Sequence, residues 1–127
     1  MLNNNKTYEN SNLRDVQITF NDGICTIFKA IERKLIENIG NFDFSNGSVG
    51  VGHYFQAYNN NISIDRIIRI PLNDKIDPQD VAQIGEEFYR IVRIQYKDDK
   101  RPKYMSLSLQ RSAFQYINAV PEEENDG

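Results

Sequence analysis

The sequence predicts an all-β fold, a small β-barrel or sandwich with a long glycine-bearing loop and flexible termini. Short segments rich in β-branched and aromatic residues follow one another along the chain. Turn-forming residues separate these segments at regular intervals. Several segments alternate apolar and polar residues, most clearly residues 104–111, where Met105, Leu107 and Leu109 fall on one side. About six or seven short strands in such succession are typical of a small sandwich or barrel.

The length of 127 residues favours one domain. We expect a β-barrel domain over residues 16–120, between a flexible N-terminal arm at 1–15 and a disordered acidic tail at 121–127. A chain of this size buries about two thirds of its unfolded surface, which is enough for a core without disulfides. The single cysteine, Cys25, lies in an apolar run and is expected to be a small core residue.

The net charge of −3 comes from the tail. Residues 121–127 contain four acidic side chains and no basic one, and the rest of the chain has 15 basic against 14 acidic residues. This nearly neutral body lacks the strong basic excess of a typical nucleic-acid-binding protein.

The first part of the domain contains one ambiguous segment. Residues 16–20 and 24–28 predict strands on either side of an Asn-Asp-Gly turn. Residues 28–39 allow an amphipathic helix, because their apolar side chains recur at helical spacing. The same residues also allow a hairpin that turns near Arg33 and Lys34 and returns as far as Phe44.

Residues 40–52 are expected to form a long surface loop, because they contain four glycines among asparagine, serine and aspartate. Gly50 and Gly52 do not make a nucleotide-binding fingerprint, since the third glycine and the strand-then-helix context are absent. His53 is the only histidine and has no companions at metal-ligand spacing, so we expect an ordinary strand residue and no metal site.

The segment that follows predicts two strands and a turn. We expect an aromatic strand at residues 54–58, a turn at the three asparagines, and an isoleucine-rich strand at residues 62–70 that Pro71 ends. The even positions of the second strand are the core side. Arg66 falls on that side, so it must reach past the edge, pair with a carboxylate or contact another subunit.

The last third of the chain predicts three more strands, at residues 81–84, 88–96 and 104–111, with a turn around Asp77 and Asp80 before them. A short apolar extension is expected to dock after the last strand. Its apolar residues are Phe114, Tyr116, Ile117 and Val120. No Ser-His-Asp arrangement, metal-ligand spacing or phosphate loop occurs, so we expect no enzyme activity and no cofactor.

Four segments resemble a known protein family in their order and spacing. They are NDGICTIF at residues 21–28, VGVGHYFQA at 49–57, IDRIIRIP at 64–71, and QDVA at 79–82 with YRI and LSL downstream. Over about residues 20–111, the chain resembles the head-closure, or head–tail joining, proteins of long-tailed bacteriophages of Gram-positive bacteria, which include head–tail adaptors and stoppers.

The resemblance implies a small β-barrel and favours the hairpin over the helix for residues 28–44. It implies a structural virion protein of the phage neck, made in the host cytoplasm and assembled as a homo-oligomeric ring, expected to be a dodecamer. The ring would lie below the portal-bound adaptor and above a tail completion or tail tube protein. It would close the DNA-filled head and then form part of the exit channel, through which DNA passes without sequence-specific binding.

The resemblance also implies roles for particular residues. The loop expected to face the channel consists of Asn41, Phe42, Asp43, Phe44, Ser45, Asn46, Gly47, Ser48, Val49, Gly50, Val51 and Gly52. The residues expected at the subunit interface are His53, Tyr54, Phe55, Tyr58, Arg66 and Arg69. The alternative from a different class is a small β-barrel that binds nucleic acid in a regulatory role, through exposed aromatic and basic side chains.

Overall fold

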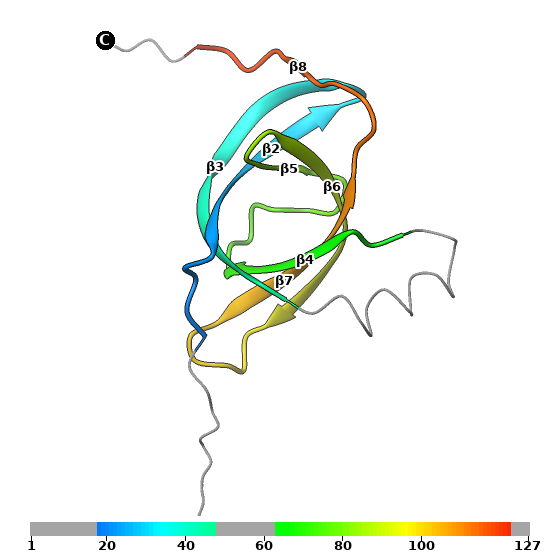
Figure 1. The fold of residues 1–127 in the computed structure, drawn as a ribbon. Coiled ribbons are helices and arrows are strands. Elements are labelled where there is room, and N and C mark those ends of the chain that lie inside the picture. The colour runs from blue at the N-terminus through cyan, green and yellow to red at the C-terminus, as the bar shows by residue number, and fades with distance from the viewer. Residues whose placement is uncertain (1–17, 48–62, 123–127) are drawn as a thin grey trace, which may run out of the picture.

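The computed structural model describes residues 18–47 and 63–122, and every regular element in these ranges is a β-strand (Figure 1). The strands are β2 (Gly23–Ile31), β3 (Lys34–Asn46), β4 (Arg66–Pro71), β5 (Val81–Ile84), β6 (Glu87–Lys97), β7 (Tyr104–Arg111) and β8 (Ile117–Asn118). Within these ranges no helix is long and apolar enough to cross a membrane.

The strands form a closed barrel. Antiparallel neighbours follow the order β2-β5-β6-β7-β4-β3, and pairing between β2 and β3 joins the two ends of that order. The short β8 runs parallel to the start of β3 and lies outside this cycle. The predicted all-β class and small barrel are therefore confirmed.

A β2–β3 hairpin occupies the segment for which the sequence also allowed a helix. Ile31 pairs with Lys34 across a turn at Glu32 and Arg33, and Glu32 adopts a positive φ of 56°. The register shifts twice along the hairpin, so Ile36 and Ile39 have no direct partner on β2. Such bulges bend and twist a strand, which suits a small closed barrel.

The prediction of a loop over residues 40–52 is wrong for residues 40–46, which belong to β3. Their composition is typical of a loop, but from residue 41 to residue 44 their side chains alternate. Phe44 is 1% exposed in the core, whereas Asn41 and Asp43 are exposed on the outer side. Period-two alternation with a paired neighbour outweighs the low strand preference of asparagine and aspartate. Residues 48–52 lie outside the described ranges.

Two other strand predictions need correction. Residues 18–20, at the end of the predicted strand 16–20, are not in a strand. The strand predicted from residue 62 begins at Arg66, although Ile64 is buried as its even position predicted and the Asp65 N–H donates to the Leu109 carbonyl at 2.8 Å. Residues 16 and 17, the aromatic segment 54–58 and the turn that follows it lie outside the described ranges.

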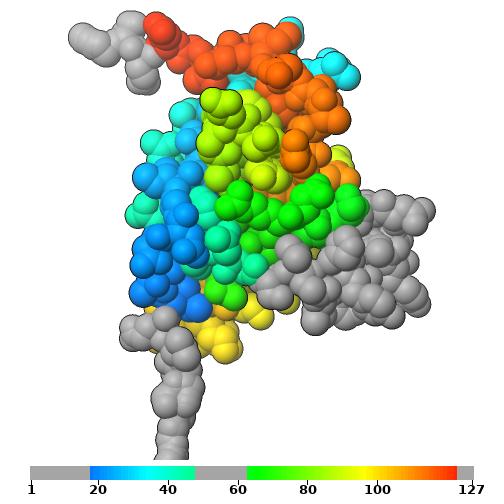
Figure 2. Space-filling view, viewed as in Figure 1, coloured from blue at the N-terminus to red at the C-terminus, as the bar shows by residue number. Residues whose placement is uncertain are grey.

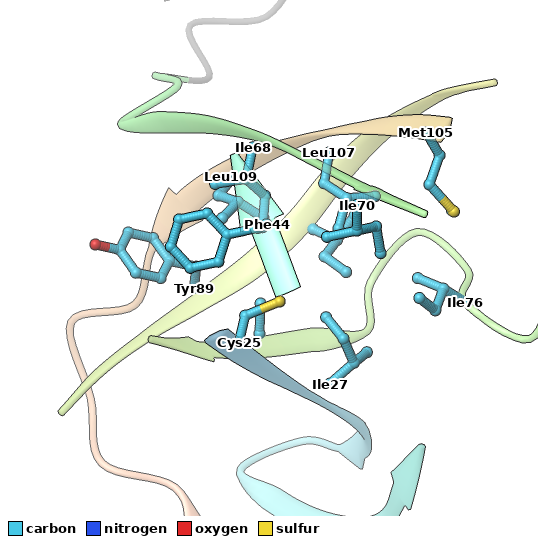
Figure 3. Packing of buried hydrophobic residues seen from close by; sticks show 12 residues of the cluster. Cys25, Ile27, Phe44, Ile68, Ile70, Ile76, Tyr89, Met105, Leu107 and Leu109 are labelled. Carbon is cyan, nitrogen blue, oxygen red and sulfur yellow. The ribbon is translucent and has the colours of Figure 1, made fainter. Parts of the chain in front are cut away.

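The core fills the inside of the barrel. Cys25 and Ile27 from β2, Phe44 from β3 and Leu107 from β7 point toward one another there (Figure 3). Cys25 is fully buried, as predicted. The three strands predicted in the last third of the chain are present, and their alternating apolar residues Met105, Leu107 and Leu109 are all fully buried.

A second, smaller cluster covers one end of the barrel. Phe28, Leu35 and Val81 form its buried centre, and Tyr116 and Val120 pack against it from the segment after β7. This segment, coloured orange, runs across the end of the barrel beside the yellow-green β5–β6 hairpin (Figure 2). The docked extension expected from the sequence is therefore confirmed for Tyr116 and Val120, whereas Phe114 is 37% exposed and Ile117 is 60% exposed.

Candidate subunit interface

Arg66 begins β4 on the side that faces the core, between the buried Ile64 and Ile68. Its guanidinium carbon lies 5.2 Å from the centroid of the Phe44 ring, and its Nη2 donates to Asn46 Oδ1 at 3.2 Å. The sequence allowed Arg66 to reach past the strand edge, pair with a carboxylate or contact another subunit. In the structure its guanidinium lies over the Phe44 ring and reaches the Asn46 side-chain amide. A cation held over a ring in this way contributes about 0.5–1 kcal/mol at an exposed site.

Arg69 is half-buried and lies on the opposite face of β4, because side chains alternate along a strand. It is paired in register with Ser45 on β3 and with Ser106 on β7. The two arginines of the predicted interface therefore occupy different environments. Arg66 has partners within its own chain, whereas Arg69 projects from the outer surface between two serine-bearing strands.

The outer edge of β3 has a long run of residues without a strand partner. On the side away from β2, β8 pairs only with Lys34 and Leu35, and β4 pairs only with Ser45 and Asn46. Within residues 18–47 and 63–122, no strand pairs with residues 36–44 on that side. An unpaired edge of this length presents peptide N–H and carbonyl groups on which another strand can pair.

Exposed isoleucines adjoin the same edge, at the tip of the β2–β3 hairpin. Ile31 is 59% exposed, Ile117 is 60% exposed and Ile36 is 37% exposed. Ile31 and Ile117 flank Lys34 in register, one on each neighbouring strand. Burial of such a side chain stabilises by about 1.5–3 kcal/mol, so this tip favours association with an apolar partner.

Two aspartates predicted to form a turn also hold a lysine from β2. Lys29 Nζ lies 2.8 Å from Asp77 Oδ2 and 2.9 Å from Asp80 Oδ2. Desolvation by partial burial acts to lower the pKa of Lys29, but the hydrogen bonds and charges of the two carboxylates outweigh it, so the pKa is raised. The network fixes β2 against the turn before β5.

Some residues of the predicted channel loop and interface lie in the described strands, and the others lie outside the described ranges. Asn41, Phe42, Asp43, Phe44, Ser45 and Asn46 lie in β3, and Gly47 follows it, its N–H bound to the Ile67 carbonyl at 2.7 Å. Phe44 and Ser45 are buried and cannot face a channel as the barrel stands. The rest of the channel loop, from Ser48 to Gly52, and the interface residues His53, Tyr54, Phe55 and Tyr58 lie outside the described ranges, so their roles stay predictions.

The structure also shows features that sequence reasoning missed. The open β3 edge depends on how far β4 and β8 extend along β3, and the Lys29 network joins residues 48 and 51 positions apart. No local motif signals either feature. In the part of the chain that the structure describes, no group of three or more His, Cys, Asp or Glu side chains is arranged to hold a metal ion.

No protein-family model, curated protein or solved structure matches this chain.

Proposed function

We propose that this chain is a structural protein of the bacteriophage neck. Copies of it form a ring, of twelve as the resemblance implies, below the portal and its adaptor. The ring closes the DNA-filled head, joins it to the tail and forms part of the channel through which DNA leaves.

The open outer edge of β3 carries this proposal, because it supports the assembly of copies side by side. Residues 36–44 offer backbone groups for strand pairing, and the exposed Ile31, Ile36 and Ile117 adjoin them. Proteins that remain single in solution usually shield such edges with charge, proline or a covering segment. A ring subunit needs a surface of this kind, since each copy must contact a neighbour.

The family resemblance supports the phage role specifically. Three of the segments that carry it fall in or beside barrel strands: residues 21–28 lead into β2, residues 64–71 include β4, and residues 107–109 lie in β7. The segments therefore come together in one barrel, although they are far apart in the chain. A small β-barrel is the fold that the resemblance implies.

The charge distribution suits a passage for DNA. Outside residues 121–127 the chain has 15 basic and 14 acidic residues, so the body is nearly neutral. A surface that neutralised many phosphates would bind DNA tightly at low salt and hold it in place. A neutral channel lets DNA pass.

The test is assembly on the phage neck. The full chain is mixed with a purified portal–adaptor complex, and the product is examined by negative-stain electron microscopy and mass photometry. We expect rings of twelve copies of the 14.8 kDa chain on the adaptor face of the complex. The chain alone and the complex alone are the controls.

A chain that stays monomeric and does not bind the complex at any concentration tested contradicts the proposal. A DNA-binding measurement at low salt separates the alternative role. Strong affinity for free DNA that weakens steeply with added salt is expected of a nucleic-acid-binding barrel and not of the proposed ring.

A further inference from the structure

A cavity of about 360 Å³ lies at the end of β7, where the C-terminal segment begins. Arg90 of β6 lines one side, Gln110 and Arg111 of β7 line another, and Phe114 and Tyr116 of the following segment complete the wall. The Phe114 and Tyr116 rings pack with their centroids 4.9 Å apart, and Ser112 Oγ lies 3.1 Å from the Tyr116 hydroxyl. The wall therefore combines aromatic faces with hydroxyl groups.

Arginines make this cavity positive. Arg90 donates from Nη1 to Gln79 at 3.1 Å and from Nη2 to Gln110 at 2.7 Å, so both of these partners are neutral. Within residues 18–47 and 63–122, no carboxylate lies within 4.0 Å of the Arg90 guanidinium. Two neutral amides therefore orient this guanidinium without compensating its charge.

The other two arginines add to that charge. Arg111 uses its Nε for a 2.8 Å contact with Glu87, and both side chains of this pair are at least half exposed. Arg33 does not line the cavity, but its guanidinium carbon lies 4.4 Å from the centroid of the Phe114 ring, which does. Asp65 Oδ2 accepts the Arg111 N–H at 2.8 Å, so Glu87 and Asp65 offset part of this charge. Three arginines against these two carboxylates leave this corner of the barrel with a positive balance, and arginine forks are well suited to carboxylates.

An acidic segment follows β8 in the chain. Residues 121–127 contain Glu122, Glu123, Glu124 and Asp126 and no basic residue. The Ala119 N–H donates to the Leu35 carbonyl at 2.8 Å, and Val120 and Pro121 border a second hollow lined by residues 36–38 of β3. After Tyr116 the described chain therefore runs away from the arginine cavity and ends beside the open β3 edge, at the upper left of Figure 1.

We propose that the acidic segment 121–127 of one copy docks in the arginine cavity of a second copy. The charges are complementary, and the segment sets out from the β3 edge, where the proposed ring places the neighbour. Carboxylates would take bidentate contacts from the Arg90 and Arg111 guanidiniums. Ser112 and Tyr116 share one hydrogen bond, so whichever of the two hydroxyls accepts in it can donate to a further oxygen. The contact would act as a strap between adjacent copies, and it rests on the proposed ring.

Disulfide trapping in the full chain tests this contact. Ala113→Cys puts a thiol in the cavity wall and Glu124→Cys puts one in the acidic segment, and the two variants are purified apart, mixed and oxidised. Cys25 does not interfere, because it is fully buried. In the control, Asp74→Cys replaces Ala113→Cys. Asp74 is exposed and lies after the last residue of β4, outside the cavity. Its replacement removes a negative charge, so the control site does not repel the acidic segment.

We expect a disulfide between residues 113 and 124 of different copies, identified by mass spectrometry, at a yield at least tenfold above that with the Asp74→Cys control. Adding Arg90→Gln and Arg111→Gln, or raising the salt to about 1 M, should lower that yield about tenfold, since salt at this level screens exposed charges beyond about 3 Å. Circular dichroism confirms that the arginine variant is folded.

Three results would overturn the contact between copies. One is a yield no higher than the control, and another is a yield unaffected by the loss of both arginines. The third comes from the chain carrying both cysteines: an internal disulfide in a monomer would place a chain's own segment in its own cavity. Portal-bound rings without the 113–124 disulfide would refute this strap and leave the neck role standing. The disulfide without rings would refute the neck role and leave the contact standing.

Discussion

Lys29 Nζ on β2 lies 2.9 Å from Oδ2 of Asp80, which stands 51 positions later in the chain. The same oxygen accepts the Asp77 N–H at 2.8 Å, so one carboxylate oxygen both closes the turn before β5 and holds β2. The Asp80 side chain is 7% exposed, whereas the Asp77 side chain is 67% exposed. The two aspartates therefore look alike in sequence but are expected to contribute differently to stability.

Replacing Asp80 with alanine should lower the free energy of unfolding by about 2 kcal/mol. The substitution leaves the Asp77 N–H without its acceptor and removes the more buried of the two partners of Lys29. Asp77→Ala is the matched control and should cost less than about 1 kcal/mol, as for other exposed ion pairs. Urea unfolding of both variants measures the difference, and equal losses would mean that burial does not set the weight of these contacts.

Cys25 should make the stability of the protein depend on alkaline pH. Burial raises the pKa of its thiol from 9.0 to about 12, against a smaller lowering by the charge of Arg66. Above pH 9 the unfolded chain gains a thiolate that the folded chain resists, so stability is lost as the pH rises. The loss should be up to about 1.4 kcal/mol per pH unit until the folded thiol also ionises.

Cys25→Ala isolates this effect, because the two proteins are otherwise identical. Below pH 9 the alanine variant should be less stable by about 1–2 kcal/mol, owing to the small cavity it leaves. Above pH 9 the gap should close and then reverse. Urea unfolding between pH 8 and 11 tests this, and a constant gap would rule out titration of the buried thiol as a source of instability.

Much of the barrel could be predicted from local pattern alone. The alternation of Met105, Leu107 and Leu109 gave the bounds of β7, and the even positions around Ile68 identified the buried side of β4. Both signals are local, since a strand with one buried face must alternate. The same rule placed Arg66 on the core side, but it could not identify Phe44 and Asn46 as its partners, because they lie on another strand.

The errors arose where tertiary pairing outweighed composition. Residues 41–46 contain two asparagines and an aspartate, yet pairing with β2 and burial of the Phe44 ring hold them in β3. The candidate interface was still less predictable. An open strand edge is defined by where its neighbours stop, and the sequence of β3 does not contain that information.

Gly23→Ala should destabilise the barrel by about 1–3 kcal/mol. Gly23 has a φ of +157°, and an added Cβ would lie 2.8 Å from Cζ and 2.9 Å from Cε2 of Phe44, whose buried ring cannot move aside. Gly40→Ala is a close control, because φ is +152° there but the nearest contact is an ordinary 3.5 Å. Thermal unfolding should show the larger loss at Gly23, and equal losses would assign both to backbone strain.

The last prediction concerns the open edge itself. Gly47 donates its N–H to Ile67 on β4, and Phe44 accepts from Asp22 on the β2 side, so alternation turns the Asp43 N–H away from β2. Proline at that position removes a donor from the outer edge only, and edge strands tolerate it. Asp43→Pro should therefore fold with a stability within about 1 kcal/mol of Asp43→Ala, as urea unfolding can establish.

Mass photometry with the portal–adaptor complex should show rings for Asp43→Ala and few or none for Asp43→Pro. Rings of equal number and mass in both variants would show that neighbouring copies do not pair along this edge, and the exposed isoleucines at the hairpin tip would then be the next surface to alter.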